Sequence, residues 1–218
     1  FQYRRVIERL TGQSLSKGYT MEISNLLLDE KNIELATHIS QALEVARREV
    51  QWLFWQELDR QLRDADFEVL TGKACFKDYT RERIDRCPHE KNYGIMTRVA
   101  TFGTDTELVF YFMVDRSVYV GFSAIRAGTR KLAQEAQFDP LARILWEMNP
   151  DWRRTDYSLG WLSVEPRIDF RQFNDAAVFA LADPDKRSKA VSDLVDRSTS
   201  LIDEFLERYR SLSAQPRS

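Results

Sequence analysis

The sequence has little cysteine and histidine, and it carries no excess of charge of either sign. Its two cysteines, Cys75 and Cys87, are too few for a disulfide framework and favour a reducing compartment, so we predict a cytoplasmic protein. Lys and Arg (32 residues) nearly balance Asp and Glu (34 residues), which excludes a global electrostatic attraction to nucleic acid or to an anionic membrane. Any binding to such partners has to be local.

Long apolar runs and a signal-peptide pattern are also missing, so we predict no membrane partner. Glycine (8) and proline (6) are scarce, whereas aromatic residues make up 12% of the chain, which is typical of a packed globular protein. The length of 218 residues suffices for one sizeable core. Because the chain begins at Phe1 rather than at a methionine, we interpret it as a piece of a longer protein.

Residue patterns that carry catalysis are absent as well. Neither GxGxxG nor GxxxxGK[ST] occurs, and neither His38 nor His89 lies in a known nucleophile motif. Cys75, Cys87 and the two histidines lack the repeated close spacing of a zinc site. We therefore predict no catalytic residue, no metal ligand and no cofactor in this chain, and the residues leave open whether the longer protein is an enzyme.

The triplet Asp29-Glu30-Lys31 has the form of half of the carboxylate and lysine set with which many nucleases hold Mg²⁺. It follows the apolar run 26–28, but the nearest upstream acid, Glu22, is not a convincing partner. A helix start also follows the triplet directly. We interpret it as a solvated entry to that helix.

Helical periodicity is strongest from Asn32, which we expect to be the N-cap, to about Arg63. Three aromatic residues of this helix, Trp52, Phe54 and Trp55, cannot all face one core. At least one of them is predicted to meet a second layer, so Trp52 and Trp55 are candidate interface residues. The apolar positions of this helix follow a three-four spacing at Ala36, Ile39, Leu43, Ala46, Val50 and Leu53.

The clearest strand signals lie between residues 93 and 125. Residues 93–100 alternate in polarity, residues 108–114 are apolar in both phases, and residues 118–125 form a third run. Short turns separate the three runs, which predicts an antiparallel meander with 108–114 as a central strand covered on both faces. Gly121 in the third run indicates a bulge or the close approach of another backbone.

Two Asp-Pro pairs mark helix starts. Asp139-Pro140 opens a predicted helix that ends at Met148, and Asp183-Pro184 opens one that runs to about Arg210. Shorter elements are expected at residues 1–10 (a helix), 67–70 (a strand) and 157–164 (a strand).

These elements predict an α+β fold, an antiparallel meander sheet packed against a long N-terminal helix and a C-terminal helix. Residues 1–28 are expected to form a helical segment that joins an upstream domain. Residues 29–212 are expected to form the α+β domain. Basic residues near aromatic ones in this domain are candidate contacts to phosphate and bases: Arg126, Arg130, Lys131, Arg153 and Arg154.

The order of elements also carries a family resemblance across nearly the whole chain. It is carried by Tyr3, Val6-Ile7, Leu10-Thr11-Gly12, Met21-Glu22 to Leu28, Phe54-Trp55 with Leu58, Tyr93-Gly94-Ile95, Tyr119-Val120-Gly121-Phe122, Ile168-Asp169-Phe170 and the helix from Asp183 to Leu206. In this layout the chain resembles the C-terminal region that follows the catalytic core in bacterial and phage proteins of the PD-(D/E)XK nuclease superfamily.

The resemblance implies a non-catalytic recognition or regulatory domain of a nuclease-like protein with a role in phage defence. The Asp and Glu-x-Lys residues that would cleave DNA are absent here and are expected upstream of Phe1, together with their Mg²⁺. The implied partners are the upstream nuclease domain, another protein, or DNA. The residues leave an alternative open, a self-contained interaction or homo-oligomerisation module that does not bind nucleic acid.

Overall fold

The structure is a computed structural model, and it describes residues 17–72, 76–86, 90–102, 105–126 and 132–213. The chain divides between Ala46 and Arg47 into two compact units. The first unit carries α2 (Lys17–Leu27) and the start of α3 (Glu30–Asp64), and the second carries the rest of α3 and all later elements. The predicted helix at 1–10 lies outside the described residues.

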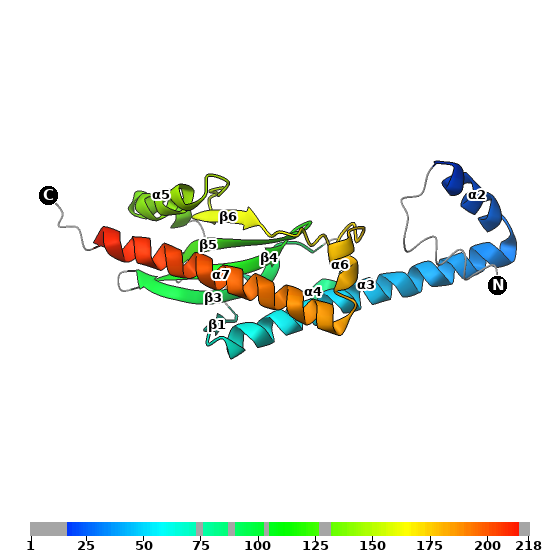
Figure 1. Ribbon diagram of the computed structural model, residues 1–218, viewed down its shortest axis with the longest axis horizontal. Helices are drawn as coiled ribbons and strands as arrows, with labels where there is room; N and C mark the ends of the chain where they lie inside the picture. The colour runs from blue at the N-terminus through cyan, green and yellow to red at the C-terminus, as the bar shows by residue number, and fades with distance from the viewer. Residues whose placement is uncertain (1–16, 73–75, 87–89, 103–104, 127–131, 214–218) are drawn as a thin grey trace. The chain divides into compact units, whose positions relative to one another are not determined.

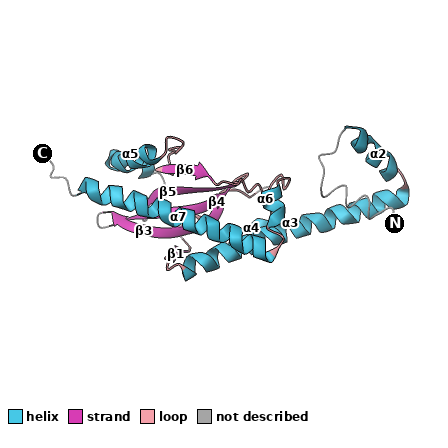
Figure 2. Ribbon diagram, in the orientation of Figure 1, coloured by secondary structure: helices cyan, strands magenta, loops and turns pink. Residues whose placement is uncertain are grey.

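A six-stranded sheet forms the centre of the second unit (Figure 2). Its order is β1-β3-β4-β5-β6, and β2 also pairs with β3. The pairings are antiparallel except for the short parallel one between β2 and β3. The predicted α+β class and the meander of three long strands are therefore confirmed. The strands are β1 (Val69–Leu70), β2 (Lys77–Asp78), β3 (Tyr93–Phe102), β4 (Thr106–Val114), β5 (Val118–Arg126) and β6 (Gly160–Ser163).

One face of the sheet packs against helices (Figure 1). Side chains of one phase along β4, such as Phe110 and Phe112, are fully buried there because alternate residues of a strand point to the same side. The ring of Phe122 in β5 lies 4.5 Å from that of Phe205 in α7 (Pro184–Ser213), measured between centroids. The helices α3, α5 (Asp139–Met148) and α7 all contribute buried side chains to this core.

Both helix starts marked by proline are confirmed. The helix α5 begins at Asp139, and α7 begins at Pro184. Asp183 Oδ1 accepts hydrogen bonds from the backbone N–H groups of Lys186 and Asp185, both at 3.0 Å. The two backbone N–H groups have no partner within the helix, so Asp183 caps its start. The same hydrogen bonds lower the pKa of the Asp183 carboxyl.

The start of α3 differs from the expectation. The helix begins at Glu30 rather than after an Asn32 cap, and Asp29 Oδ1 accepts a hydrogen bond from the backbone N–H of Lys31 at 3.1 Å. Asn32 lies inside the helix, and its side-chain amide donates to the carbonyl of Leu26 at 2.9 Å. The interpretation of the triplet 29–31 as a helix entry is confirmed.

The aromatic residues of α3 divide between two surroundings. Phe54 and Trp55 are fully buried, whereas Trp52 is half-buried. The ring of Trp55 lies 6.3 Å from that of Tyr93 in β3, and both tryptophans contact Tyr79. Trp55 therefore belongs to the core and is closed to a partner, while Trp52 keeps part of its ring exposed. Short helices complete the unit: α4 (Arg81–Asp85), α6 (Ala176–Ala180), Leu132–Gln134 and Ala136–Phe138.

Gly121 in β5 sits where two neighbouring strands come close. A Cβ atom at this position would lie 2.5 Å from Cζ of Tyr111 in β4 and 2.6 Å from the carbonyl oxygen of Gly160 in β6. The expectation of a close backbone approach is confirmed. The irregular register lies elsewhere, in β3 between Arg98 and Ala100.

We predict that Gly121→Ala lowers the free energy of unfolding by about 1–3 kcal/mol, because backbone as well as the Tyr111 ring must move. The matched control is Gly160→Ala, whose Cβ would meet side-chain atoms first, Leu145 Cδ1 at 2.9 Å and Trp152 Cε3 at 3.0 Å, rather than backbone atoms. Urea denaturation followed by circular dichroism should show the larger loss for Gly121→Ala. Equal losses would contradict the packing described for β5.

Candidate ligand-binding cleft

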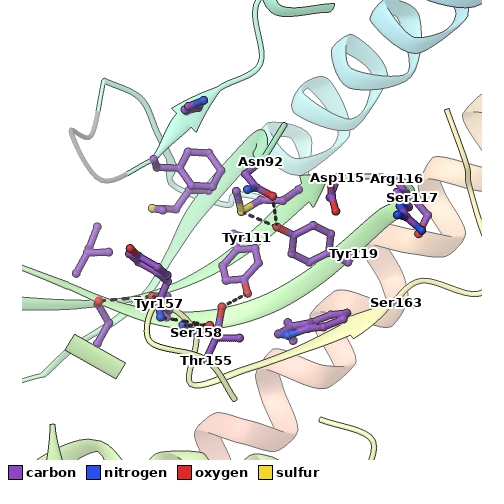
Figure 3. A pocket seen from close by; sticks show the side chains of 18 of the residues that line it. Asn92, Tyr111, Asp115, Arg116, Ser117, Tyr119, Thr155, Tyr157, Ser158 and Ser163 are labelled. Carbon is purple, nitrogen blue, oxygen red and sulfur yellow. Dashed lines mark hydrogen bonds between the residues drawn. The ribbon is translucent and has the colours of Figure 1, made fainter. Parts of the chain in front are cut away.

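The second face of the sheet has different surroundings. In the described part of residues 47–218, the buried apolar residues of the helices belong to the core on the first face. The second face carries a smaller cluster built on strands, namely Leu70, Met96, Val109, Tyr111 and Ile125. A cleft of about 760 Å³ opens over this cluster (Figure 3). We call it the aromatic cleft.

β4 is central, as predicted, since it pairs with both β3 and β5. Its second phase is also mostly buried, with Val109 0% and Tyr111 3% exposed, so the expected burial of both faces is confirmed. On this side the residues that pack against the strand lie on other strands and on loops rather than on helices, and Tyr111 and Met113 line the aromatic cleft. Small-molecule sites have volumes of roughly 300–1,000 Å³, and the cleft lies within that range.

Aromatic and sulfur-containing side chains from three adjacent strands form the floor of the cleft. Met113 of β4 pairs in register with Tyr119 of β5, and Gly121 pairs with Trp161 of β6. The ring centroids of Tyr119 and Trp161 are 5.5 Å apart at an interplanar angle of 68°. Both rings are half-buried, so they present flat apolar surface to the cleft.

One end of the cleft is closed by the loop before β6 (Figure 3). Tyr111 Oη and Ser158 Oγ are 2.5 Å apart, and Ser123 Oγ donates to the carbonyl of Tyr157 at 2.5 Å. Burial raises the pKa of the Tyr111 hydroxyl well above its usual range. A hydroxyl that keeps its proton this firmly is a hydrogen-bond partner rather than a base, so this pair positions the loop.

The turn between β4 and β5 forms the other end, where Asn92 and Tyr119 lie together (Figure 3). Tyr119 Oη lies 3.3 Å from Asn92 Oδ1, and the Asn92 backbone N–H donates to the carbonyl of Val114 at 2.8 Å. Asn92 has a positive φ of 56°, a conformation that asparagine tolerates better than most residues. Burial, with a smaller effect from Asp115, raises the pKa of Tyr119 to about 12.

Acidic and basic side chains alternate around this end. Asp115 Oδ1 lies 3.5 Å from Arg171 Nη2 and 3.7 Å from Lys91 Nζ. Two cations therefore share one carboxylate. This local excess of positive charge would favour an anionic ligand.

Three cations line the cleft itself, namely Lys77, Arg116 and Arg167. Lys77 pairs with Glu90 at 2.8 Å, and Arg167 pairs with Asp169 at 2.7 Å. Arg116, exposed in the turn between β4 and β5, makes no hydrogen bond or ion pair within the described residues. Its guanidinium is therefore available to a ligand.

The basic residues predicted to contact nucleic acid have local partners. Arg126 Nε lies 3.2 Å from Asp105 Oδ2, and Arg154 Nη1 lies 2.8 Å from Asp139 Oδ1. The guanidinium of Arg153 lies 5.3 Å from the ring centroid of Trp161. Arg126 and Arg154 are thus committed to carboxylates, whereas Arg153 borders the aromatic cleft.

Several sequence candidates fall outside the described residues: Arg130, Lys131, Cys75, Cys87 and His89. Among the residues that the structure does describe, no three side chains of His, Cys, Asp or Glu gather where they could hold a metal ion. In the same residues, no helix combines the length and apolar composition needed to cross a bilayer.

The cleft residues Asn92, Arg116, Tyr119 and Trp161 were not proposed as site residues from the sequence, and Tyr119 entered only through the family resemblance. The sequence did indicate an apolar second face, because residues 108–114 are apolar in both phases. We attributed the second phase to a covering layer. That phase shows that the face is apolar, but the period of two cannot show what lies over it. The close approach at Gly121 was the second signal, because it brings the aromatic strands together.

No protein-family model, no curated protein and no solved structure matches this chain. The resemblance to the C-terminal region of PD-(D/E)XK nuclease-like proteins therefore stays a prediction.

The raised pKa of Tyr119 predicts a loss of stability at high pH. An unfolded tyrosine ionises near its ordinary pKa of about 10, whereas folded Tyr119 keeps its proton up to about 12. Its contribution is thus complete below pH 10 and is lost as pH rises toward 12, by an amount on the order of 2 kcal/mol. Tyr119→Phe should show a shallower decline in unfolding free energy over this interval. Curves that stay parallel to wild type above pH 10 would contradict the burial of this hydroxyl.

Proposed function

We propose that this chain is a non-catalytic recognition domain that binds its ligand in the aromatic cleft. The observation that supports this most directly is the open second face of the sheet, where half-buried rings line a cleft of about 760 Å³. Binding sites for small molecules combine such an apolar lining with a few placed polar groups. The cleft offers Asn92, Arg116 and Ser163 in that role.

The polar groups of the cleft are suited to binding rather than to proton transfer. A general acid or base requires a group that gains or loses its proton near neutral pH. The tyrosines here hold their protons instead, since burial raises the pKa values of both Tyr111 and Tyr119. Of the two acids that line the cleft, Asp115 faces Lys91 and Arg171, and Glu165 lies exposed after β6. This arrangement supports recognition without catalysis.

We place this domain in a nuclease-like parent protein, with a role in phage defence, on the strength of the layout resemblance alone. Its partner within the parent would be an upstream Mg²⁺-dependent nuclease domain. Direct binding of DNA through Arg126 and Arg154 is the weaker part of this proposal, because both side chains already face carboxylates. Recognition in the cleft would let the domain regulate cutting without holding DNA itself.

We predict that the dye anilinonaphthalene sulfonate, which joins fused rings to an anionic group, binds the cleft with a saturable rise in fluorescence. Met113→Glu should weaken this binding about tenfold or more, because an unpaired carboxylate would be placed on the apolar floor. The matched control, Phe179→Glu, adds the same charge at an exposed apolar position on α6. Circular dichroism verifies that both variants are folded. Equal binding by all three proteins would rule out the cleft as the ligand site.

A second candidate function, homo-oligomerisation, is favoured by the apolar surface of the first unit. Ile39 and Leu43 on α3 are each 47% exposed, and Leu28 is 80% exposed. Large apolar side chains at helical spacing, exposed in one segment, are typical of helix-to-helix association. We propose a second copy of this chain as their partner.

Light scattering after size-exclusion chromatography tests this candidate. The double variant Ile39→Glu, Leu43→Glu should convert an assembly to monomer, because the charges would have to be buried between helices. The control Gln41→Glu adds a charge at an exposed polar position of the same helix and should keep the wild-type mass. A monomeric wild-type chain at micromolar concentration would remove this candidate and leave the cleft proposal untouched.

A further inference from the structure

The end of the aromatic cleft near the turn between β4 and β5 has a surface for a flat ring. Tyr119 and Trp161 are half-buried there, and Met113 Sδ lies 3.6 Å from Tyr119 Oη. The guanidinium carbon of Arg153 lies 5.3 Å from the centroid of the Trp161 ring. The backbones of the same two residues form a β-bridge, and the two contacts together fix the position of the indole. Aromatic and thioether groups favour the faces of planar rings over flexible chains. A planar ring is therefore the part of the ligand that this floor fits best.

A carboxamide stands beside this ring surface. Asn92 is fixed by its backbone hydrogen bond to Val114, and its Oδ1 lies 3.3 Å from the Tyr119 hydroxyl. The Nδ2 group of Asn92 makes no hydrogen bond within the described residues. A carboxamide can donate and accept at once, which is the pattern needed to read the edge of a nucleobase. The ring that fits is thus one with polar atoms along its edge.

An available cation lies at the same end. Arg116 follows Asp115 in the turn, and that carboxylate already faces Lys91 and Arg171, so it leaves the Arg116 guanidinium uncompensated. Ser117 next to it also lines the cleft. A guanidinium with a neighbouring hydroxyl suits a phosphate group, because its planar donors match two phosphate oxygens at once.

Taking the proposed recognition function as its basis, we propose that the ligand of the aromatic cleft is a mononucleotide. Its base stacks on one of the rings of Tyr119 and Trp161 and meets the other edge-on, because the two rings are tilted by 68°. A polar edge of the base lies toward Asn92, and the phosphate lies at Arg116. A single nucleotide fits better than a strand of nucleic acid. The cleft has the volume of a small-molecule site, and a strand would need a continuing basic track, whereas Arg126 and Arg154 are neutralised by carboxylates.

Displacement of anilinonaphthalene sulfonate from the whole chain tests this inference. The probes are the monophosphates of adenosine, guanosine, cytidine and uridine, with adenosine alone, inorganic phosphate and a twelve-residue oligothymidylate as comparison ligands. At least one monophosphate should displace the dye, and adenosine and phosphate should each bind about tenfold more weakly or worse. Isothermal titration calorimetry of the best monophosphate then gives its affinity directly.

Arg116→Ala should weaken binding of that monophosphate about tenfold while leaving the affinity for adenosine unchanged. Arg143→Ala is the matched control, because it removes another exposed arginine, on α5, which packs on the first face of the sheet. Unchanged monophosphate binding by Arg116→Ala would overturn the assignment of the phosphate.

The remaining outcomes separate this inference from the proposed function. Dye binding that depends on Met113 but is displaced by none of the monophosphates would overturn the nucleotide assignment and leave the recognition function standing. Displacement by the oligothymidylate alone would also overturn it, in favour of a nucleic-acid strand. Absence of dye binding in the cleft would overturn both.

Discussion

The packing of the sheet against α7, seen most directly where Phe122 meets Phe205, is the contact on which the rest of the structure depends. Burial of large aromatic side chains is the main source of stability in a domain of this size, at roughly 25 cal/mol for each Å² of apolar surface removed from water. The same layer receives α3 through Phe54 and Trp55. Once these helices occupy the first face, the second face is left to the strands themselves.

The pairing of the strands then decides which side chains lie on the second face of the sheet. Alternation along β4 sends Phe110 and Phe112 to the helices, and it sends Tyr111 and Met113 to the cleft. The absence of a side chain at Gly121 lets the Tyr111 ring lie across β5 and reach Ser158. The residues that stabilise the sheet therefore also form the floor of the candidate site, and this connects the fold to the proposed recognition function.

Charge acts locally in this protein. The net charge of -2 gives no long-range field, and many of the described cations on the surface face a carboxylate, as Arg126 and Arg154 do. Arg116 is an exception among the residues lining the cleft. An anionic group of a ligand would pair with the Arg116 guanidinium at this point. Such binding needs neither a metal ion nor a reactive side chain.

The elements with regular periods were predictable from the sequence. The meander of β3, β4 and β5 and the helices after Asp139 and Asp183 follow from polarity patterns and capping residues, which act over short distances. The cap of α3 was misplaced because Asp29 and Asn32 are both good caps, and only the folded backbone decides between them.

The candidate site was not predictable in the same way. Asn92, Arg116 with Tyr119, and Trp161 come from three separate segments, and strand register brings them to one cleft. The partners of Arg126 and Arg154 are likewise distant in sequence, so a basic residue near an aromatic one could not be recognised as already paired. Tertiary contacts decide both questions.

Hydroxyl-radical footprinting with mass spectrometry tests the open face of the sheet most directly, because it measures the solvent exposure of each side chain in the folded chain. With each labelling rate divided by that of the same residue in the urea-unfolded chain, we expect Met113, Tyr119 and Trp161 to be labelled much faster than Phe110, Phe112 and Phe122, and a ligand bound in the cleft to protect the first group. Equal protection of both groups in the free protein would mean that another layer covers the second face, which would contradict the account.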